Sequence, residues 1–289
     1  MRILSIQSAV AYGHVGNSAA VFPLQRLGHE VLPVSTVLFS NHTGYGAWRG
    51  PVLAGTDVHE VILGIEERGA LAEVDLVLSG YQGSPEIAEV ILDAVARVKA
   101  ANPAATYACD PVMGNARSGC FVNPAIPPLI RDRIVPAADL ITPNQFELGE
   151  ITGHTGLTAA ASPGVDVVIK AAQQARAMGP GTVLVTSVEH ADLPAEEIEM
   201  LAVTAAGVWS VRTPRLPMKA NGSGDVTAAL FSAHLGTSGD PEVALRRTAS
   251  SVYDLLDNTW AAGSRELLLV ESQATYEHPR EQFVVEQLR

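Results

Sequence analysis

Cysteines and long apolar runs are the scarcest features of this chain of 289 residues. Its two cysteines, Cys109 and Cys120, form neither a disulfide framework nor a zinc-binding spacing. Such sparse cysteine predicts a reducing compartment, the cytoplasm. No apolar run approaches the ~18 residues of a membrane-spanning helix, and no signal-peptide pattern follows Arg2. We therefore expect neither a signal peptide nor a membrane-embedded segment.

Basic residues are also scarce, since 19 Lys and Arg stand against 31 Asp and Glu, for a formal net charge of −12. Proteins that bind nucleic acids or anionic membranes by bulk attraction need a basic surface, so we expect neither partner. With 47% hydrophobic and only 17% charged residues, the chain is not a disordered one. A phosphate-bearing substrate would have to be bound by local groups, against the net charge.

Short apolar runs alternate with amphipathic stretches through most of the chain. This alternation predicts an α/β fold with a mostly parallel sheet and helices on both of its faces. For the first helix we expect Asn17 or Ser18 as the N-cap and Gly28 as the stop. The predicted strands are 2–7, 30–37, 74–79, 105–109, 138–142 and 181–186, and the predicted helices are 17–28, 56–68, 85–100 and 164–178.

The pattern changes near residue 198, where two apolar runs flank a tight turn. We predict an antiparallel hairpin at a sheet edge, followed by helices at about 223–237 and 240–257. No linker divides the chain, which favours a single domain over 1–289. Residues 38–54, rich in glycine and aromatic side chains, do not fit a simple βα connection and predict a flap over a site.

Polar residues directly follow several of the predicted strands. Ligands of open parallel sheets bind beyond the carboxyl ends of the strands, so this shared position indicates a site. Each residue alone is weak evidence, because turns also favour these residue types. The residues are Ser8, Tyr81, Asp110, Thr142, Asn144, Thr186 and Ser187.

The sequence Gly222-Ser223-Gly224-Asp225 precedes a predicted helix. Its glycines allow a tight turn that exposes consecutive backbone N–H groups, and these form an anion site at a helix N-terminus. Such a site suits the charge on a transferring phosphoryl group, and the aspartate could accept a proton from a substrate hydroxyl. An ordinary helix N-cap with flexible glycines explains the local motif somewhat better, because such loops are common caps.

A second pattern, Asn144-x-x-Glu147, opens a helix directly after a strand. A carboxylate and an amide oxygen on one helical face suit Mg²⁺, which prefers oxygen ligands. The same spacing forms a capping box, with Asn144 as the N-cap and Glu147 at N3. The sequence leaves both interpretations open.

Together these motifs resemble the ribokinase-like small-molecule kinases, and nearly the whole chain resembles the pyridoxal kinases among them. The most specific matches are 12–20 (YGHVGNSAA) and 39–45 (FSNHTGY), and the others are 5–8, 22–25, 78–81, 109–114 and 222–225. The resemblance implies a ribokinase-like fold and phosphorylation of the 5′-hydroxyl of pyridoxal, pyridoxine or pyridoxamine by ATP. It also implies Mg²⁺, a monovalent cation and a homodimer.

The resemblance further implies roles for individual residues on the substrate side. Asp225 is the general base, and the amides of Gly222, Ser223 and Gly224 stabilise the phosphoryl group. Cys120, in a loop after Asp110, could react reversibly with the pyridoxal aldehyde, and His42 could instead be a hydrogen-bonding loop residue. The residues expected around the ring are Ser8, Thr43 and Tyr81, with Val15 and His42 in the pocket wall.

On the nucleotide side, the resemblance places Asp110 and Glu147 near the ATP phosphates and Mg²⁺. Thr186 stands where many bacterial relatives carry lysine, so one phosphate contact is expected to be missing. Residues 212–221 are expected to form a loop over the adenine and ribose. The remaining expected ATP contacts are Thr142 (or the monovalent cation beside it), Asn144, Ser187, Gly222 and Gly224.

Two other functions stay open. A related kinase for hydroxymethylpyrimidine or a sugar is disfavoured by the ring-contact set of Ser8, Thr43 and Tyr81. A non-catalytic vitamin B6 binder is disfavoured because Asp225 and Glu147 are both present.

Overall fold

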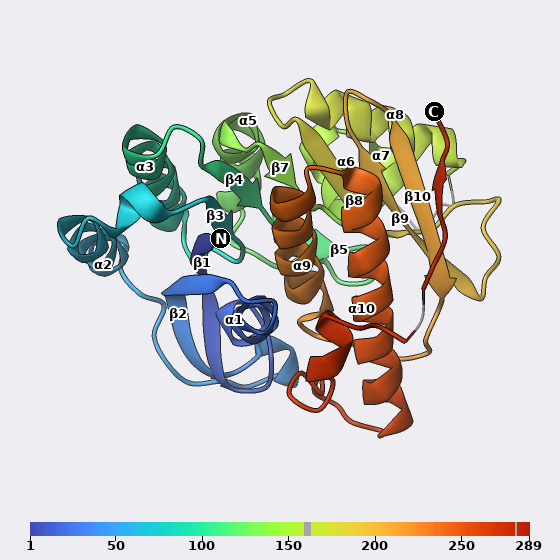
Figure 1. Cartoon of the computed structure of the whole chain (residues 1–289), viewed down its shortest axis with the longest axis horizontal. Helices are drawn as coiled ribbons and strands as arrows, with labels where there is room; N and C mark the ends of the chain where they lie inside the picture. Colours follow the sequence, from blue (N-terminus) through green and yellow to red (C-terminus); the bar gives the residue numbers. More distant parts are fainter. Residues whose placement is uncertain (159–162, 281) are drawn as a thin grey trace.

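The computed structural model describes residues 1–158, 163–280 and 282–289. A nine-stranded sheet in the order β11-β10-β9-β8-β7-β4-β3-β1-β2 runs through its centre (Figure 1). Neighbouring strands are parallel from β2 to β8, and β9, β10 and β11 are antiparallel. The strands are β1 (Arg2–Tyr12), β2 (Glu30–Asn41), β3 (Leu76–Ser79), β4 (Thr106–Cys109), β7 (Leu140–Ile141), β8 (Thr182–Val188), β9 (Glu197–Val203), β10 (Val208–Pro214) and β11 (Val285–Gln287).

Helices cover both faces of the sheet because successive strand residues point to opposite sides. In β8, Val183 and Val185 belong to the core cluster that includes residues of α2, α3, α6 and α8, whereas Leu184 belongs to the cluster that includes residues of α1, α9 and α10. The longer helices are α1 (Asn17–Arg26), α2 (Gly55–Glu67), α3 (Pro85–Ala101), α6 (Gln145–Thr152), α8 (Val165–Arg176), α9 (Ser223–Ser238) and α10 (Pro241–Ala261). The shorter elements include α4 (Ile126–Leu129), α5 (Val135–Ala137), α7 (Thr155–Thr158), β5 (Gly114–Asn115) and β6 (Gly119–Cys120).

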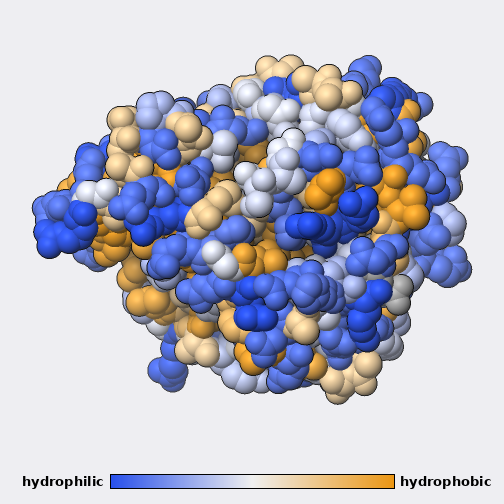
Figure 2. All heavy atoms as spheres, viewed as in Figure 1, coloured by the Kyte–Doolittle hydropathy of each residue, from blue (hydrophilic) through white to orange (hydrophobic). Residues whose placement is uncertain are grey.

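The predicted α/β architecture is confirmed, and every predicted strand and helix overlaps an observed one. The predicted hairpin is β9–β10, but β11 pairs with the outer side of β10 and forms the sheet edge. Hydrophilic residues cover much of the face seen in Figure 2, with hydrophobic residues in separate groups between them. No helix in the described part of the chain combines the length and hydropathy needed to cross a membrane.

The predicted N-cap of the first helix is wrong. Gly16 precedes the helix, and Asn17, its first residue, points its side chain toward the sheet. There the Asn17 amide donates to the Val34 carbonyl at 3.0 Å and accepts from Ser5 Oγ at 2.7 Å. The Asn17 side chain binds a buried carbonyl in preference to capping the helix, because an unpaired buried carbonyl would cost stability. The predicted stop is confirmed, since Gly28 follows the helix at φ +80°.

The first two strands run further than predicted and carry the segment 38–54, which we call the flap. β1 and β2 stay paired as far as Tyr12 and Asn41, after a shift in register near Gln7. Residues 49–53 then return beside β2, where Leu38 N–H donates to the Pro51 carbonyl at 3.0 Å. The flap is thus a continuation of the sheet, with a 3₁₀ turn at its tip, Thr43–Tyr45.

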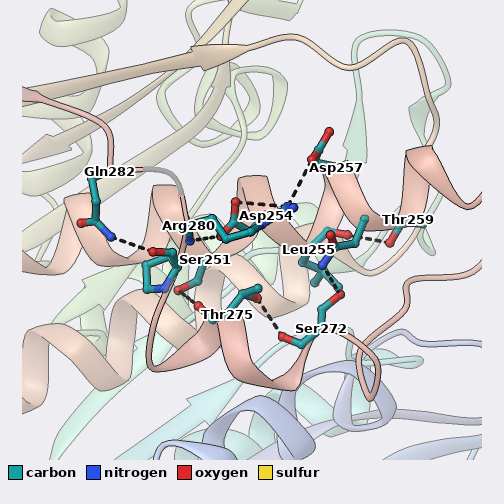
Figure 3. A network of polar contacts seen from close by, with 11 residues as sticks. Ser251, Asp254, Leu255, Asp257, Thr259, Ser272, Thr275, Arg280 and Gln282 are labelled. Carbon is teal, nitrogen blue, oxygen red and sulfur yellow. Dashed lines mark hydrogen bonds and ion pairs between the residues drawn. The ribbon is translucent and has the colours of Figure 1, made fainter.

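The C-terminal segment is fastened to α10 by a polar network (Figure 3). Asp254 of α10 has a fully buried side chain, and its carboxylate accepts the Arg280 backbone N–H. The Arg280 guanidinium lies 3.5 Å from Asp254 and 3.1 Å from the partly exposed Asp257. Ser251 Oγ donates to the Thr275 carbonyl at 2.9 Å. The network leads the chain toward its place at the sheet edge.

We expect Asp254→Ala to lower the free energy of unfolding by about 1.5–3 kcal/mol, because it removes the charge-assisted hydrogen bonds that the buried carboxylate accepts from Arg280. Asp257→Ala removes a carboxylate that binds the same Arg280 from an exposed position, so it should cost at most about 1 kcal/mol. Urea denaturation of both variants measures the difference. Equal losses would show that burial does not set the strength of this network.

Candidate active site

The polar residues after the parallel strands lie along one edge of the sheet, as predicted. Backbone hydrogen bonds hold these strand ends side by side. Asp110 N–H donates to the Ser79 carbonyl at 2.8 Å, and Thr142 N–H to the Cys109 carbonyl at 3.0 Å. Thr142 Oγ1 in turn donates to the Asp110 carboxylate at 3.3 Å. Residues remote in the sequence therefore converge here because the strands are parallel.

The Gly-Ser-Gly-Asp segment forms the start of α9 and packs against the loop 13–16. Gly222 is the N-cap, with φ +87°, and a Cβ there would overlap the His14 carbonyl oxygen. Asp225 lies in the first turn of α9, and its carboxylate accepts the Gly16 backbone N–H. Although Asp225 keeps some exposed surface, burial of its carboxyl group raises its pKa to about 6.

Ser8 lies on the opposite side of the same loop. Gly16 has φ +53°, and a Cβ there would overlap the Ser8 carbonyl and hydroxyl oxygens. Ser8 and Val15 are both buried, at 6% and 8% exposed. The loop 13–16 thus separates Ser8 from the start of α9 by one layer of backbone.

The loop glycines are residues that sequence reasoning left without a role. Gly13 and Gly16 both have positive φ, at +87° and +53°, which glycine tolerates best. The G-x-x-G spacing inside the motif 12–20 was the available signal. The structure adds what that spacing does, since it brings one backbone N–H to Asp225.

Three carboxylates, those of Asp110, Glu147 and Asp225, are close enough to influence one another. The pKa of Asp110 is raised well above its usual range, first by burial and then by the charges of Glu147 and Asp225. Burial also raises the pKa of Glu147, while backbone N–H groups act in the opposite direction. Among the described residues, none of the three carboxylates forms a salt bridge with a basic side chain, so no basic side chain offsets their repulsion.

Asn144 and Glu147 form the capping box that their spacing allows. Asn144 Oδ1 accepts the Glu147 N–H at 2.9 Å, and Glu147 Oε2 accepts the Asn144 N–H at 3.0 Å. Glu147 Oε1 also accepts the N–H groups of Met113 and Gly114 at 2.9 and 3.3 Å. Glu147 therefore has a structural role, which a charge interaction with a nearby cation does not exclude.

The donor set at the strand ends fits a divalent cation through Asp110. The only hydrogen bond given to this buried carboxylate in the described part of the chain is the 3.3 Å contact from Thr142. A hard cation binds carboxylate oxygens and offsets the repulsion between buried carboxylates. No cluster of three or more His, Cys, Asp or Glu side chains within the described ranges forms a complete metal cage. A cation here would need ligands from its substrate or from water.

The flap reaches the site from the side of β2. His42 Nδ1 accepts the Gly44 N–H at 3.0 Å, which is the kind of contact expected of a hydrogen-bonding loop residue. Burial and the nearby Lys219 lower the pKa of His42. Lys219 comes from the segment 212–221, whose first residues, up to Pro214, belong to β10. The flap and this segment therefore lie close together. Thr43 begins the 3₁₀ turn at the tip of the flap.

The other predicted contacts are spread around the site. Tyr81 packs against the core on the α2–α3 side of the sheet, and burial raises its pKa. Thr186 forms a bridge with Asn144, and Ser187 is the one described non-glycine residue with positive φ, at +52°. Cys109 is buried as predicted, whereas Cys120 is exposed and pairs with Gly114 in the β5–β6 ribbon.

Comparison with known proteins identifies the family. The family model described as phosphomethylpyrimidine kinase matches residues 71–269. The pyridoxal kinase PdxY of Leifsonia xyli subsp. xyli is 69% identical over 99% of both chains, and that of Corynebacterium diphtheriae is 59% identical over 100% of both. The chain belongs to the pyridoxal kinase family.

Solved structures of this family share the whole fold. The pyridoxal kinase of Leishmania donovani in complex with ADP and pyridoxamine superposes with a TM-score of 0.89 at 28% identity, over 100% of this chain and 99% of that one. A putative phosphomethylpyrimidine kinase from Bacteroides thetaiotaomicron, at 21% identity and a TM-score of 0.88, over 99% of this chain and 97% of that one, shares the fold. The ribokinase-like α/β fold predicted from the sequence is confirmed.

Proposed function

We propose that this protein transfers the γ-phosphate of ATP to the 5′-hydroxyl of pyridoxal, and to the same hydroxyl of pyridoxine and pyridoxamine. The observation that carries the proposal is the placement of the Asp225 carboxylate. It lies at the N-terminus of α9, is oriented by the Gly16 N–H, and adjoins Gly222 at the bend before the helix. Membership of the pyridoxal kinase family supports the same reaction.

Asp225 acts on the hydroxyl proton. A carboxylate is a weak base for an alcohol, so position contributes more than basicity, as in other phosphoryl transfers. As the hydroxyl oxygen bonds to phosphorus and the bond to the ADP oxygen breaks, the proton passes to the Asp225 carboxylate. The N–H groups around Gly222, Ser223 and Gly224 stabilise the charge on the transferring group.

We expect kcat/KM for pyridoxal to be level at neutral pH and to fall toward tenfold per unit below about pH 6. Burial raises the pKa of Asp225 to about 6, and only the ionised carboxylate accepts a proton. The apparent value belongs to Asp225 together with Asp110 and Glu147, since these groups interact. Initial rates between pH 4.5 and 8, with circular dichroism to confirm folding, measure it. A flat profile down to pH 4.5 would contradict Asp225 as the base.

In this proposal Asp110 faces Mg²⁺, and Glu147 holds the adjacent backbone while adding negative charge nearby. Mg²⁺, when bound, neutralises the phosphate charge that an acidic protein would otherwise repel. Thr142, which donates to Asp110 at 3.3 Å, lies beside the nucleotide or a monovalent cation. Asn144, Thr186 and Ser187 complete the ATP side, and the positive φ of Ser187 is a strain consistent with a functional position.

The vitamer ring would lie between the flap and the strand ends. Ser8, Thr43 and Tyr81 contact the ring in this proposal, with Val15 and His42 in the pocket wall. Cys120 is exposed and pairs with Gly114, whose N–H donates to Glu147. In this proposal the Cys120 thiol could react reversibly with the pyridoxal aldehyde. We further propose a single domain, a homodimer and a cytoplasmic location, as the family resemblance and the sparse cysteine favour.

A second candidate is phosphorylation of hydroxymethylpyrimidine, which the description of the matching family model favours. Measuring ATP consumption with pyridoxal, pyridoxine, pyridoxamine and hydroxymethylpyrimidine distinguishes the two. We expect at least one vitamer to have a kcat/KM well above that of hydroxymethylpyrimidine. The reverse order would overturn the proposal, and tight vitamer binding without ATP consumption would indicate a binding protein.

A further inference from the structure

Glu266 lies after α10, outside every motif of the sequence, and binds two separate parts of the substrate side. Its Oε1 accepts a hydrogen bond from the Tyr45 hydroxyl, and its Oε2 accepts the His14 backbone N–H at 3.1 Å. Ser264 holds Glu266 in place, since its hydroxyl donates to the Glu266 carbonyl at 2.6 Å and accepts the Glu266 N–H at 3.2 Å. One carboxylate therefore joins two segments remote in the sequence.

The first of these segments is the tip of the flap. Tyr45 ends the 3₁₀ turn that begins with Thr43, the predicted ring contact. The guanidinium of Arg265 lies 5.2 Å from the centre of the Tyr45 ring, and the Tyr12 ring meets it edge-on at 6.0 Å. The hydrogen bond from Tyr45 thus fixes the flap at the residue where its aromatic contacts also gather.

The second segment is the loop 13–16, which leads directly to the catalytic end of α9. Gly13 has φ +87°, and a Cβ there would overlap the Glu266 carboxylate, so the loop passes tightly against it. The His14 carbonyl in turn lies against Gly222, and the Gly16 N–H binds Asp225. A shift of the Glu266 carboxylate would therefore displace both the tip of the flap and the loop 13–16.

We propose that Glu266 is a positioning residue that latches the flap to the loop 13–16 and so sets the affinity for the vitamer. This inference rests on the proposed function. Thr43 on the flap and Val15 on the loop stand on the two sides that the latch joins, whereas the ATP-side residues Asp110, Thr142 and Thr186 lie on other strand ends. Loss of the latch should accordingly weaken the binding of the vitamer and leave the binding of ATP unchanged.

Steady-state kinetics of Tyr45→Phe and Glu266→Ala test the latch. We expect each to raise KM for pyridoxal about tenfold and to change KM for ATP less than twofold. Tyr45→Phe should lower kcat less than threefold, and Glu266→Ala should lower it further because it also frees the loop 13–16 that supports Asp225. Because both variants break the same hydrogen bond, the double variant should be clearly less affected than the product of the single effects. If Glu266→Ala does not fold, Tyr45→Phe carries the test alone.

Two matched variants serve as controls. Glu266→Gln keeps the shape, and its amide can accept from His14 N–H while donating to the Tyr45 oxygen, so KM should stay within threefold. Tyr12→Phe removes the hydroxyl of the aromatic ring that packs beside Tyr45. Within the described ranges this hydroxyl forms no hydrogen bond with Glu266, so the kinetics of the variant should match those of the parent enzyme. An equal rise in both KM values, or an equal effect of Tyr12→Phe, would overturn the proposal.

Hydrogen exchange without substrate separates this inference from the proposed function. In Tyr45→Phe, amides of 13–16 and 42–46 should exchange at least tenfold faster, while those of β3 and β4 are unchanged. Unchanged exchange together with unchanged KM would overturn the latch. A parent enzyme that phosphorylates no vitamer would instead overturn the proposed function, and exchange would still show whether the two segments are joined.

Discussion

Asp225→Asn is expected to lower kcat for pyridoxal by about a thousandfold, within the range of general-base contributions, and to leave ATP affinity within a few-fold. Asparagine keeps the shape and can still accept the Gly16 N–H, so α9 should begin as before. It cannot accept the hydroxyl proton. A coupled assay of ADP release gives kcat, and calorimetry with a non-hydrolysable ATP analogue gives the affinity.

Asp240→Asn is the matched control for this result. Asp240 is also an aspartate at a helix start, where its carboxylate accepts the N–H groups of Glu242 and Val243 at 2.8 and 3.3 Å. Asparagine caps helices about as well as aspartate, so this variant should have parental kcat. A folded Asp225→Asn enzyme that retains more than a tenth of the parental kcat would contradict the assigned role.

The second large effect is expected from Gly222→Ala. A Cβ at Gly222 would overlap the His14 carbonyl oxygen, which is backbone and cannot move aside cheaply, and the φ of +87° is itself unfavourable for alanine. The start of α9 and the loop 13–16 must separate. We expect a fall in kcat/KM of at least a hundredfold and a destabilisation of about 2 kcal/mol or more, measured by initial rates and by urea denaturation.

Gly239→Ala separates the overlap from the strain. Gly239 caps the other end of α9 with φ +68°, and its Cβ would meet nothing within 4 Å. This variant should lose only about 1 kcal/mol, the cost of a left-handed non-glycine residue, and keep its activity. If both glycine variants lose activity equally, the close approach of α9 to the loop is not what shapes the site.

Much of the fold could be predicted because its signals are local. Apolar runs and amphipathic stretches located the parallel strands and the helices, and the turn before residue 208 located the β9–β10 hairpin. The sequence predictions failed where residues distant in the sequence bind a side chain or a strand edge. Asn17 or Ser18 was predicted as the cap of the first helix, but the Val34 carbonyl and Ser5 bind the Asn17 side chain. The strand β11 was not predicted, because it is defined by its pairing with the distant strand β10.

In the candidate site, too, residues in local motifs could be predicted from the sequence, whereas residues joined only by tertiary contacts could not. The Gly-Ser-Gly-Asp and Asn-x-x-Glu motifs were visible because each acts within one helix start, where spacing determines geometry. Glu266 was not visible, since its partners Tyr45 and His14 are far from it in the sequence and no spacing connects them.

The scarcity of basic residues now has a more specific meaning. By itself the sequence determined that the chain is acidic, α/β and similar to kinases, because composition, periodicity and motifs are properties of the chain alone. Only the tertiary structure decided that Asp110, Glu147 and Asp225 come together without a basic partner in the described part of the chain, and that the loop 13–16 supports Asp225. Such contacts depend on parallel strand ends meeting at one edge, which is set by the folding of the whole sheet.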